Sequence, residues 1–177
     1  MRMLDALELD DIRHMIELLA EQHLTVAVAE GDTGGVLLEL LTAVPGSSRV
    51  VRGGVVAYHD DLKRAVLGVA PKLIEQHGAV SAEVAAAMAH GIRRVAAADL
   101  GLATTGIAGP GGGTAAKPVG LAYVSVVSAA QAVTTAHRWP GDRAANRRAS
   151  AHAAVHAVLE LLKDPRQPGA LEKNEKQ

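Results

Sequence analysis

The loop between residues 106 and 118 has the least ordinary composition in the chain, with five glycines within eight residues. Glycines let backbone N–H groups converge on a ligand because no side chain blocks the approach. Such a loop can bind a phosphate or stabilise an oxyanion. It is not a P-loop, because no Gly-Lys-Ser/Thr follows. It is not a dinucleotide fingerprint either, because it leads into a predicted strand. We expect ligand contacts at Gly106, Gly109, Gly112 and Gly113; the alternative is a mobile surface loop.

Two further groups of residues could assist chemistry. Tyr58 and Lys63 are separated by five positions across a predicted strand-to-helix turn. A lysine there can lower the pKa of a neighbouring hydroxyl, or act as a base when desolvated. Arg143 and Arg147 are four residues apart on one helix face and could bind a carboxylate or phosphate together. Taken alone, each pair is better explained by ordinary surface or half-buried side chains.

His152 and His156 have the i, i+4 spacing that zinc sites use on a helix. Their segment lacks the glutamate of a metalloprotease helix, and the sequence offers no identifiable third ligand. We therefore expect no metal and no cofactor.

The elements that must position these residues follow from the apolar patterns. Helical spacing covers residues 10–22, 36–41, 83–98 and 140–162, with short helices around Lys63 and after Pro71. Asp60 or Asp61 is expected to cap the helix that carries Lys63. Short apolar runs predict strands at 24–29, 50–58, 100–105, 119–128 and 132–139, the last two as an antiparallel hairpin. This order predicts an α/β fold, a three-layer α/β/α sandwich with a mixed sheet.

Composition excludes several classes of function. The 177 residues carry a net charge of −1, no cysteine and only three aromatic side chains. Without a thiol there is no disulfide framework, thiolate zinc site or cysteine nucleophile. Because the 18 basic residues are balanced by 19 acidic ones, we expect no nucleic-acid partner. We also expect no membrane span and a cytoplasmic location, since no apolar run reaches about 20 residues and the acidic N-terminus is unlike a signal peptide.

We expect one domain over residues 1–163 and a flexible charged tail at 164–177. Seven motifs run through the domain: Ala29-Glu30-x-x-Thr33-Gly34-Gly35, Val44-Pro45-Gly46-Ser47-Ser48, Gly53-Gly54-Val55-Val56-x-Tyr58, His77-Gly78-Ala79-Val80-Ser81, Thr105-Gly106-Ile107-Ala108-Gly109-Pro110-x-Gly112-Gly113, Lys117-Pro118-Val119-Gly120 and Gly141-Asp142-Arg143. In order and spacing they resemble the CinA C-terminal domain family.

Stand-alone members of that family are nicotinamide-nucleotide amidohydrolases, which convert nicotinamide mononucleotide to nicotinic acid mononucleotide and ammonia. The resemblance implies a three-layer fold, a pyridine nucleotide as ligand, a homodimer and no metal. It implies that the catalytic positions of the family correspond to Gly31, Asp32, Tyr58, Lys63 and Thr105. It further implies substrate contacts at Thr33, Gly34, the glycine loop and Arg143.

One departure from the family motif decides the functional expectation. The family reads Ala-Glu-Ser-Cys-Thr-Gly-Gly, with the serine as presumed nucleophile, whereas this chain has Gly31 and Asp32 there. Loss of a covalent nucleophile can reduce turnover by about 10⁶. We therefore expect a domain that has lost deamidase activity but still binds a nucleotide or a partner. Gly31→Ser is expected to restore some activity if the pocket is otherwise intact.

Two alternatives stay open. In the first, the protein is a hydrolase in which Asp32 acts as nucleophile or as base for water; Asp32 would need a raised pKa to act as an acid. In the second, the domain has only a structural or assembly role. Thr33, Ser47 and Ser48 could in principle replace the missing hydroxyl, although the two serines are typical of turns.

Overall fold

The computed structural model describes residues 6–163, and its five strands form one sheet in the order β2-β1-β3-β4-β5. The strands are β1 (Val26–Glu30), β2 (Val51–Val56), β3 (Leu100–Gly106), β4 (Leu121–Val127) and β5 (Ala132–Arg138). β1 pairs in parallel with β2 and β3, whereas β4 is antiparallel to both β3 and β5. The mixed sheet and its antiparallel hairpin are confirmed.

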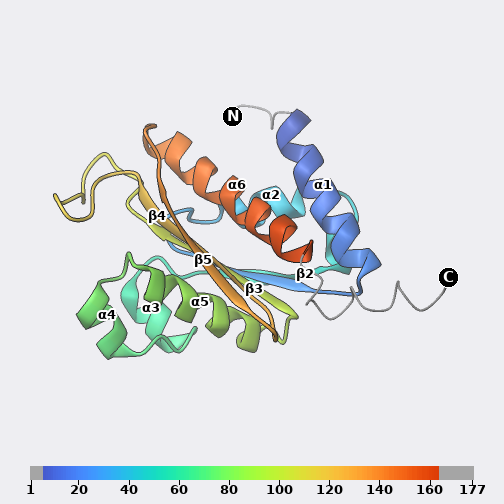
Figure 1. Ribbon diagram of the computed structural model, residues 1–177, viewed down its shortest axis with the longest axis horizontal. Helices are drawn as coiled ribbons and strands as arrows, with labels where there is room; N and C mark the ends of the chain where they lie inside the picture. Colours follow the sequence, from blue (N-terminus) through green and yellow to red (C-terminus); the bar gives the residue numbers. More distant parts are fainter. Residues whose placement is uncertain (1–5, 164–177) are drawn as a thin grey trace.

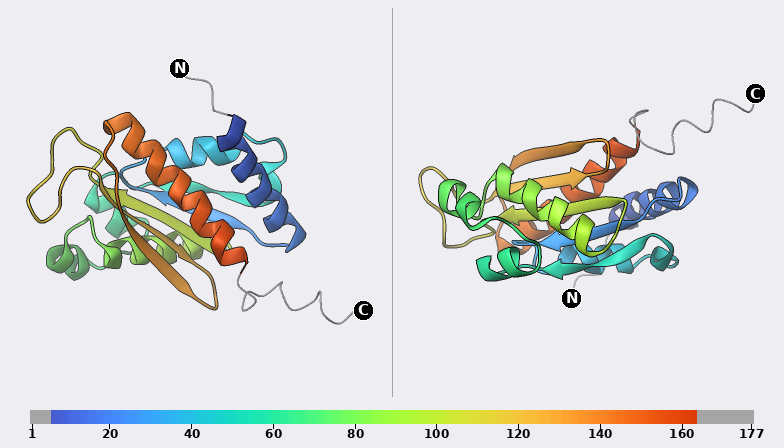
Figure 2. Two further views of the ribbon diagram at one scale, coloured as in Figure 1. Left: turned by 45° about the horizontal axis from the view of Figure 1, so that its top comes forward. Right: turned by 90° about the horizontal axis from the view of Figure 1, so that it is seen from below.

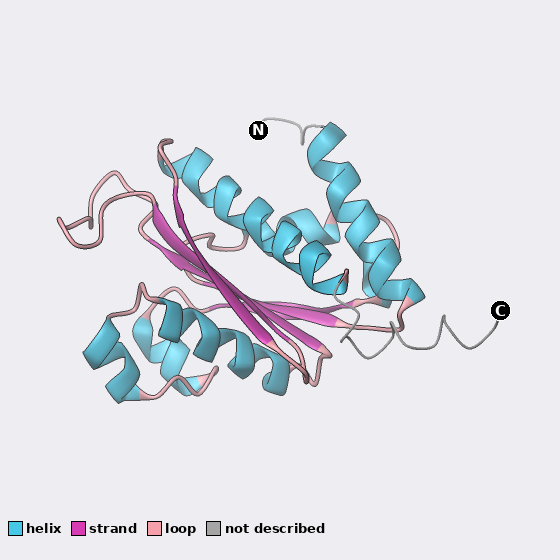
Figure 3. Cartoon of the chain, in the orientation of Figure 1, coloured by secondary structure: helices cyan, strands magenta, loops and turns pink. Residues whose placement is uncertain are grey.

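Helices cover both faces of the sheet, as the three-layer prediction requires. They are α1 (Ala6–Glu21), α2 (Val36–Thr42), α3 (Asp60–Ala65), α4 (Pro71–His77), α5 (Ala82–Val95) and α6 (Arg143–Leu162), with a 3₁₀ turn η1 (Ser47–Arg49) before β2. Figures 1 and 3 show α1, α2 and α6 on one face and α3, α4 and α5 on the other. Each layer has its own apolar cluster against the sheet.

The alternation of side chains along β1 supplies both clusters. Val26 and Val28 pack under α1, α2 and α6, whereas Ala27 and Ala29 face α5. These small residues let α5 approach closely. At Gly101 on β3 an added Cβ would stand 2.0 Å from the carbonyl oxygen of Ala89 in α5. The alanine-rich sequence of α5 thus reflects close helix-to-sheet packing.

Within the described residues, side-chain caps mark the starts of three helices. Ser81 caps α5 by accepting the Val84 N–H at 3.3 Å, and Asp142 caps α6 by accepting the Ala145 N–H at 2.9 Å. The expectation for α3 was wrong. His59 is its N-cap residue, and its Nδ1 accepts the Asp61 N–H at 3.3 Å. Asp60 and Asp61 lie in the first turn instead, where an acidic side chain is favoured by the helix dipole.

No helix within residues 6–163 is both long and apolar enough to cross a bilayer. The predicted tail at 164–177 lies outside the described residues. Beyond the carboxyl end of β3, the glycine-rich loop extends away from the sheet near the start of α6 (Figure 2).

Candidate functional site

A pocket of about 190 Å³ lies at the carboxyl ends of the parallel strands β1, β2 and β3, the usual ligand position in α/β sheets. It brings together seven residues singled out from the sequence: Gly31, Asp32, Tyr58, Lys63, Thr105, Gly106 and Arg143. They come from four separate segments, because parallel strands end at one edge of the sheet and α6 begins beside it. Their catalytic and binding roles stay predictions, but their assembly into one pocket is a feature of the fold.

Two cations of the pocket have different surroundings. Lys63 is buried, and its Nζ donates to Oδ1 of Asp60 at 2.8 Å. Asp60 also lines the pocket and was expected only as a cap. Arg143 donates to the Tyr58 hydroxyl oxygen at 2.8 Å and to the Gly109 carbonyl at 3.0 Å. Since both of these acceptors are neutral, the charge of Arg143 is not cancelled by them.

Asp32 is the most perturbed acid of the site. Only 8% of its surface is exposed. Its Oδ2 accepts a hydrogen bond from Ser150 Oγ at 3.0 Å, and its Oδ1 is buried without a hydrogen-bond partner among the described residues. Burial raises the pKa of Asp32 from 3.8 to about 6, and the neighbouring Glu30 carboxylate adds to the rise. The Ser150 bond and the Arg147 charge act in the opposite direction.

Glu30, at the end of β1, has a structural role that the sequence did not indicate. Its buried carboxylate accepts the N–H groups of Gly35 at 2.8 Å, Leu37 at 3.1 Å and Leu38 at 2.9 Å. These groups belong to the first turn of α2, which has no side-chain bond from its own cap residue. Glu30 therefore ties α2 to the end of β1 and fixes the path of the loop between them.

Thr33 and Gly34 do not line the pocket. The Thr33 side chain is buried against Thr104, with 2.8 Å between the two hydroxyl oxygens. The Thr33 carbonyl accepts from Nε and Nη2 of Arg147 at 3.0 and 2.7 Å, and the Gly34 carbonyl accepts from Nη2 at 3.3 Å. Arg147 thus stabilises this loop and does not join Arg143 as a pair of anion ligands. The Thr33 hydroxyl does not face the pocket as a replacement nucleophile.

At Gly31 the pocket wall has no room for a side chain in the present backbone position. An added Cβ would stand 2.9 Å from the Thr104 carbonyl oxygen and 3.3 Å from Thr105 Cα. The Gly31 N–H donates to the same carbonyl at 2.9 Å. Ser47 and Ser48 lie in η1, before the amino end of β2, and so cannot supply a hydroxyl to a pocket at the carboxyl end.

The glycine loop is only partly at the pocket. Gly106 lines it, and Gly109 lines an adjoining depression of about 580 Å³ that shares Ala108 and Arg143 with it. Gly112 and Gly113 lie on the exposed part of the loop and line neither. The far end of the loop is anchored by Lys117, whose Nζ donates to the carbonyls of His77 and Val80.

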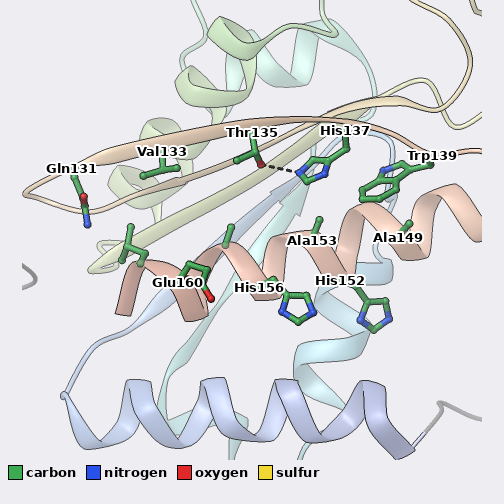
Figure 4. Close-up of a pocket in the computed structure, with 12 residues that line it drawn as sticks. Gln131, Val133, Thr135, His137, Trp139, Ala149, His152, Ala153, His156 and Glu160 are labelled. Atoms are coloured by element: carbon green, nitrogen blue, oxygen red, sulfur yellow. Dashed lines mark hydrogen bonds between the residues drawn. The ribbon is translucent and has the colours of Figure 1, made fainter. Parts of the chain in front are cut away.

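A larger groove of about 700 Å³ separates β5 from α6 (Figure 4). Val133, Thr135, His137 and Trp139 form its β5 wall. The His137 and Trp139 rings stack with centroids 4.8 Å apart. His152 and His156 line its α6 wall, but within residues 6–163 no three acidic or histidine side chains gather into a group that could hold a metal ion.

Comparison with known proteins matches residues 10–162 to the model of the CinA C-terminal domain. A CinA-like protein of Mycolicibacterium paratuberculosis is 47% identical over 165 residues, which are 90% of this chain and 37% of that protein. A CinA-like protein of Gloeobacter violaceus is 57% identical over 109 residues, 62% of this chain and 26% of the relative. The chain thus spans about a third of the length of the curated relatives it matches.

Solved structures share the fold. The competence/damage inducible protein CihA from Agrobacterium tumefaciens superposes with a TM-score of 0.88 at 36% identity, covering 93% of this chain and all of that chain. The CinA superfamily protein from Escherichia coli superposes with a TM-score of 0.84 at 28% identity, covering 90% and 94% of the two chains. The predicted α/β fold is therefore found in experimentally determined relatives.

Proposed function

The chain belongs to the CinA C-terminal domain family, and we propose that it binds a pyridine mononucleotide without catalysing hydrolysis of its carboxamide. The observation that carries this proposal is Gly31. The position of the family's serine has no side chain, and the carbonyl of Thr104 lies where a Cβ would need space. The groups that remain around the pocket are polar and suited to binding.

The shape of the site supports a mononucleotide as ligand. The pocket at the strand ends has the size of a small ring system, and the depression beside it extends toward Gly141 and Asp142. Together they fall within the range of about 300–1,000 Å³ of small-molecule sites. Arg143 stands between the two and offers a guanidinium to a phosphate. In this arrangement the nicotinamide ring enters the small pocket and the ribose phosphate follows the glycine loop.

The test is ammonia release from nicotinamide mononucleotide by the purified protein, measured beside a CinA-family amidohydrolase as positive control. We expect a rate no higher than the no-enzyme background. A turnover in the ordinary enzymatic range of about 1 to 10³ per second would refute the proposed loss of activity.

A second candidate is a hydrolase that uses Asp32, and one observation favours it. The pKa of Asp32 is raised to about 6, so this carboxyl can exist in both protonation states near neutral pH, as a general acid or base must. A screen of amide and ester substrates tests this candidate. If a substrate is turned over, Asp32→Asn should abolish the rate, and an unaffected rate would remove Asp32 from the mechanism.

The proposal includes a homodimer, as the family resemblance implies, and a cytoplasmic location, as expected from the apolar pattern and the acidic N-terminus. Light scattering after size-exclusion chromatography tests the oligomeric state: a mass near twice the chain's 18.3 kDa supports the dimer, and a monomer at all accessible concentrations refutes it. A solely structural role would be indicated if no nucleotide binds.

A further inference from the structure

Three side chains from separate segments form one hydrogen-bonded series, of which Ser150 and Asp32 are buried and Trp139 is partly exposed. Trp139, just after β5, donates from its indole Nε1 to Ser150 Oγ at 3.0 Å. Ser150, on α6, donates from the same oxygen to Asp32 Oδ2 at 3.0 Å. Ser150 is completely buried and Asp32 is 8% exposed. The two contacts differ in sequence separation: 11 positions separate Trp139 from Ser150, and 118 separate Ser150 from Asp32.

The chemistry of the three groups fixes the direction of the series. An indole N–H can only donate, so the Ser150 oxygen must accept from Trp139. The single hydroxyl proton of Ser150 is then left for the carboxylate, which can only accept when ionised. The order of donation is therefore Trp139 to Ser150 to Asp32.

We propose that Ser150 is a positioning residue for Asp32 and that the indole of Trp139 holds Ser150 in that role. The functional meaning of this assignment rests on the proposed function, because Asp32 lines the proposed nucleotide pocket. The hydroxyl holds one carboxylate oxygen while the other, Oδ1, has no hydrogen-bond partner among the described residues. Without Ser150 neither oxygen would have a side-chain donor among the described residues, and the carboxylate would keep only its backbone hydrogen bond.

The charges around Asp32 show why this bond matters. Glu30 at the end of β1 disfavours ionisation, and Arg147 of α6 favours it. On the pocket side stand Asp60 and Lys63, which pair with one another, together with Arg143 and Tyr58. Because burial is the largest influence on this carboxyl and opposes ionisation, the Ser150 bond is the main local contact that keeps Asp32 charged near neutral pH.

The Trp139 end of this hydrogen-bonded series lies at the large groove between β5 and α6. Trp139 and His137 lie side by side on its β5 wall, facing α6 (Figure 4). The hydrogen-bonded series therefore connects Trp139 of the groove to Asp32 of the pocket through the buried Ser150. A change in the orientation of the indole would reach Asp32 by altering the Ser150 hydroxyl.

Nuclear magnetic resonance can test the assignment without any ligand. Trp139 is the single tryptophan of the protein, so its indole N–H gives one identifiable signal. We would follow this signal and the Asp32 side-chain carboxyl carbon between pH 4 and pH 9 in the natural protein, Ser150→Ala, Trp139→Phe and Asp32→Asn. The imidazole of His137 stacks on the indole of Trp139, and burial lowers the pKa of His137 from its ordinary value. Because protonation of this ring would also affect the indole signal, His137→Gln is measured as well.

We expect the chemical shifts of the indole N–H and of the Asp32 carboxyl carbon to change with pH at the same midpoint. This change of the indole signal should be absent in Asp32→Asn and retained in His137→Gln. Ser150→Ala should raise the midpoint of Asp32 by about one pH unit and remove this change from the indole signal. Trp139→Phe, which keeps a ring against His137 but lacks the N–H, should raise the midpoint of Asp32 by less.

Ser125→Ala is the matched control. It removes another completely buried hydroxyl, one that donates to the Val133 carbonyl and accepts from Thr134, and it should leave the Asp32 midpoint unchanged. An unchanged midpoint in both Ser150→Ala and Trp139→Phe would overturn the assignment, as would an equal shift in Ser125→Ala. These outcomes are independent of nucleotide binding, so absence of binding would refute the proposed function and leave the positioning role to be decided by the titration.

Discussion

The amide nitrogen of Gly31 lies 2.9 Å from the carbonyl oxygen of Thr104, and a Cβ on Gly31 would lie equally close to that oxygen. The end of β1 thus lies close against β3 at the position that we propose corresponds to the family's serine. Real Cβ atoms essentially never approach a backbone oxygen so closely, so the backbone of this chain is adapted to glycine. Restoring the serine requires a backbone shift as well as a hydroxyl.

This contact changes the expectation for Gly31→Ser. We now predict that the variant is less stable by about 1–3 kcal/mol and does not gain deamidase activity, because the added atoms must displace the Thr104 backbone. Denaturant unfolding and ammonia release measure the two effects. Gly31→Ala is the matched control, because it adds the same Cβ without a hydroxyl and should be destabilised to the same extent. An active Gly31→Ser variant with undiminished stability would show that the pocket wall yields easily.

The two arginines at the start of α6 should respond differently to substitution. Arg143→Gln is predicted to weaken nucleotide affinity about tenfold or more, because the pocket loses its uncancelled cation, with little effect on unfolding. Arg147→Gln is predicted to lower stability by about 1–3 kcal/mol, because the buried Thr33 carbonyl loses its donors. Calorimetric binding and denaturant unfolding of both variants would separate the roles. Equal loss of affinity in the two variants, with equal stability, would contradict the assignment.

The raised pKa of Asp32 has a consequence for stability. Because the folded pKa of about 6 lies above the unfolded value of 3.8, the native state binds more protons than the unfolded state between these values. Stability must therefore fall as pH rises through this range, by about 3 kcal/mol for this group alone. Asp32→Asn should lack this pH-dependent decrease. The difference in the free energy of unfolding between the natural protein and Asp32→Asn, followed from pH 3.5 to pH 7.5, measures it. A constant difference would show that the carboxyl is not perturbed.

Asp32 should also make the pocket discriminate between amide and acid. At pH 8 the ionised Asp32 repels the carboxylate of nicotinic acid mononucleotide but not the neutral carboxamide of nicotinamide mononucleotide. At pH 5 Asp32 is mostly protonated, and the repulsion disappears. The measured quantity is the dissociation constant of nicotinic acid mononucleotide divided by that of nicotinamide mononucleotide. We predict that this ratio is greater at pH 8 than at pH 5 by a factor of about ten or more. The phosphate titrates in both ligands and cancels from the ratio; in Asp32→Asn the ratio should not change with pH.

Much of the fold could be predicted from the sequence because local patterns determine it. The five strands, the α/β order and the hairpin follow from apolar periodicity. The cap of α3 was assigned wrongly because Asp60 and Asp61 suit both a cap and a first turn. In the structure His59 takes the cap position, and Asp60 pairs with Lys63 three residues further along the same helix.

The candidate site was predictable where it depended on strand ends and motifs, and not where it depended on contacts between distant segments. Gly31, Tyr58, Lys63 and Thr105 meet in one pocket because the sheet places their strand ends together. No local pattern, however, indicated that Arg147 binds the Thr33 carbonyl or that Ser150 binds Asp32. Nor did any local pattern indicate that the indole N–H of Trp139 donates to Ser150.

A saturation-transfer proton nuclear magnetic resonance experiment on nicotinamide mononucleotide mixed with the natural protein tests whether the pocket binds the nucleotide without deamidating it, because one sample reports both binding and conversion. We predict saturation transfer from the protein to the nicotinamide protons, a weaker transfer in Arg143→Gln at the same ligand concentration, and no signals of nicotinic acid mononucleotide after prolonged incubation. Absence of saturation transfer at millimolar ligand would contradict a retained pocket, and the appearance of the acid product would contradict the loss of deamidation.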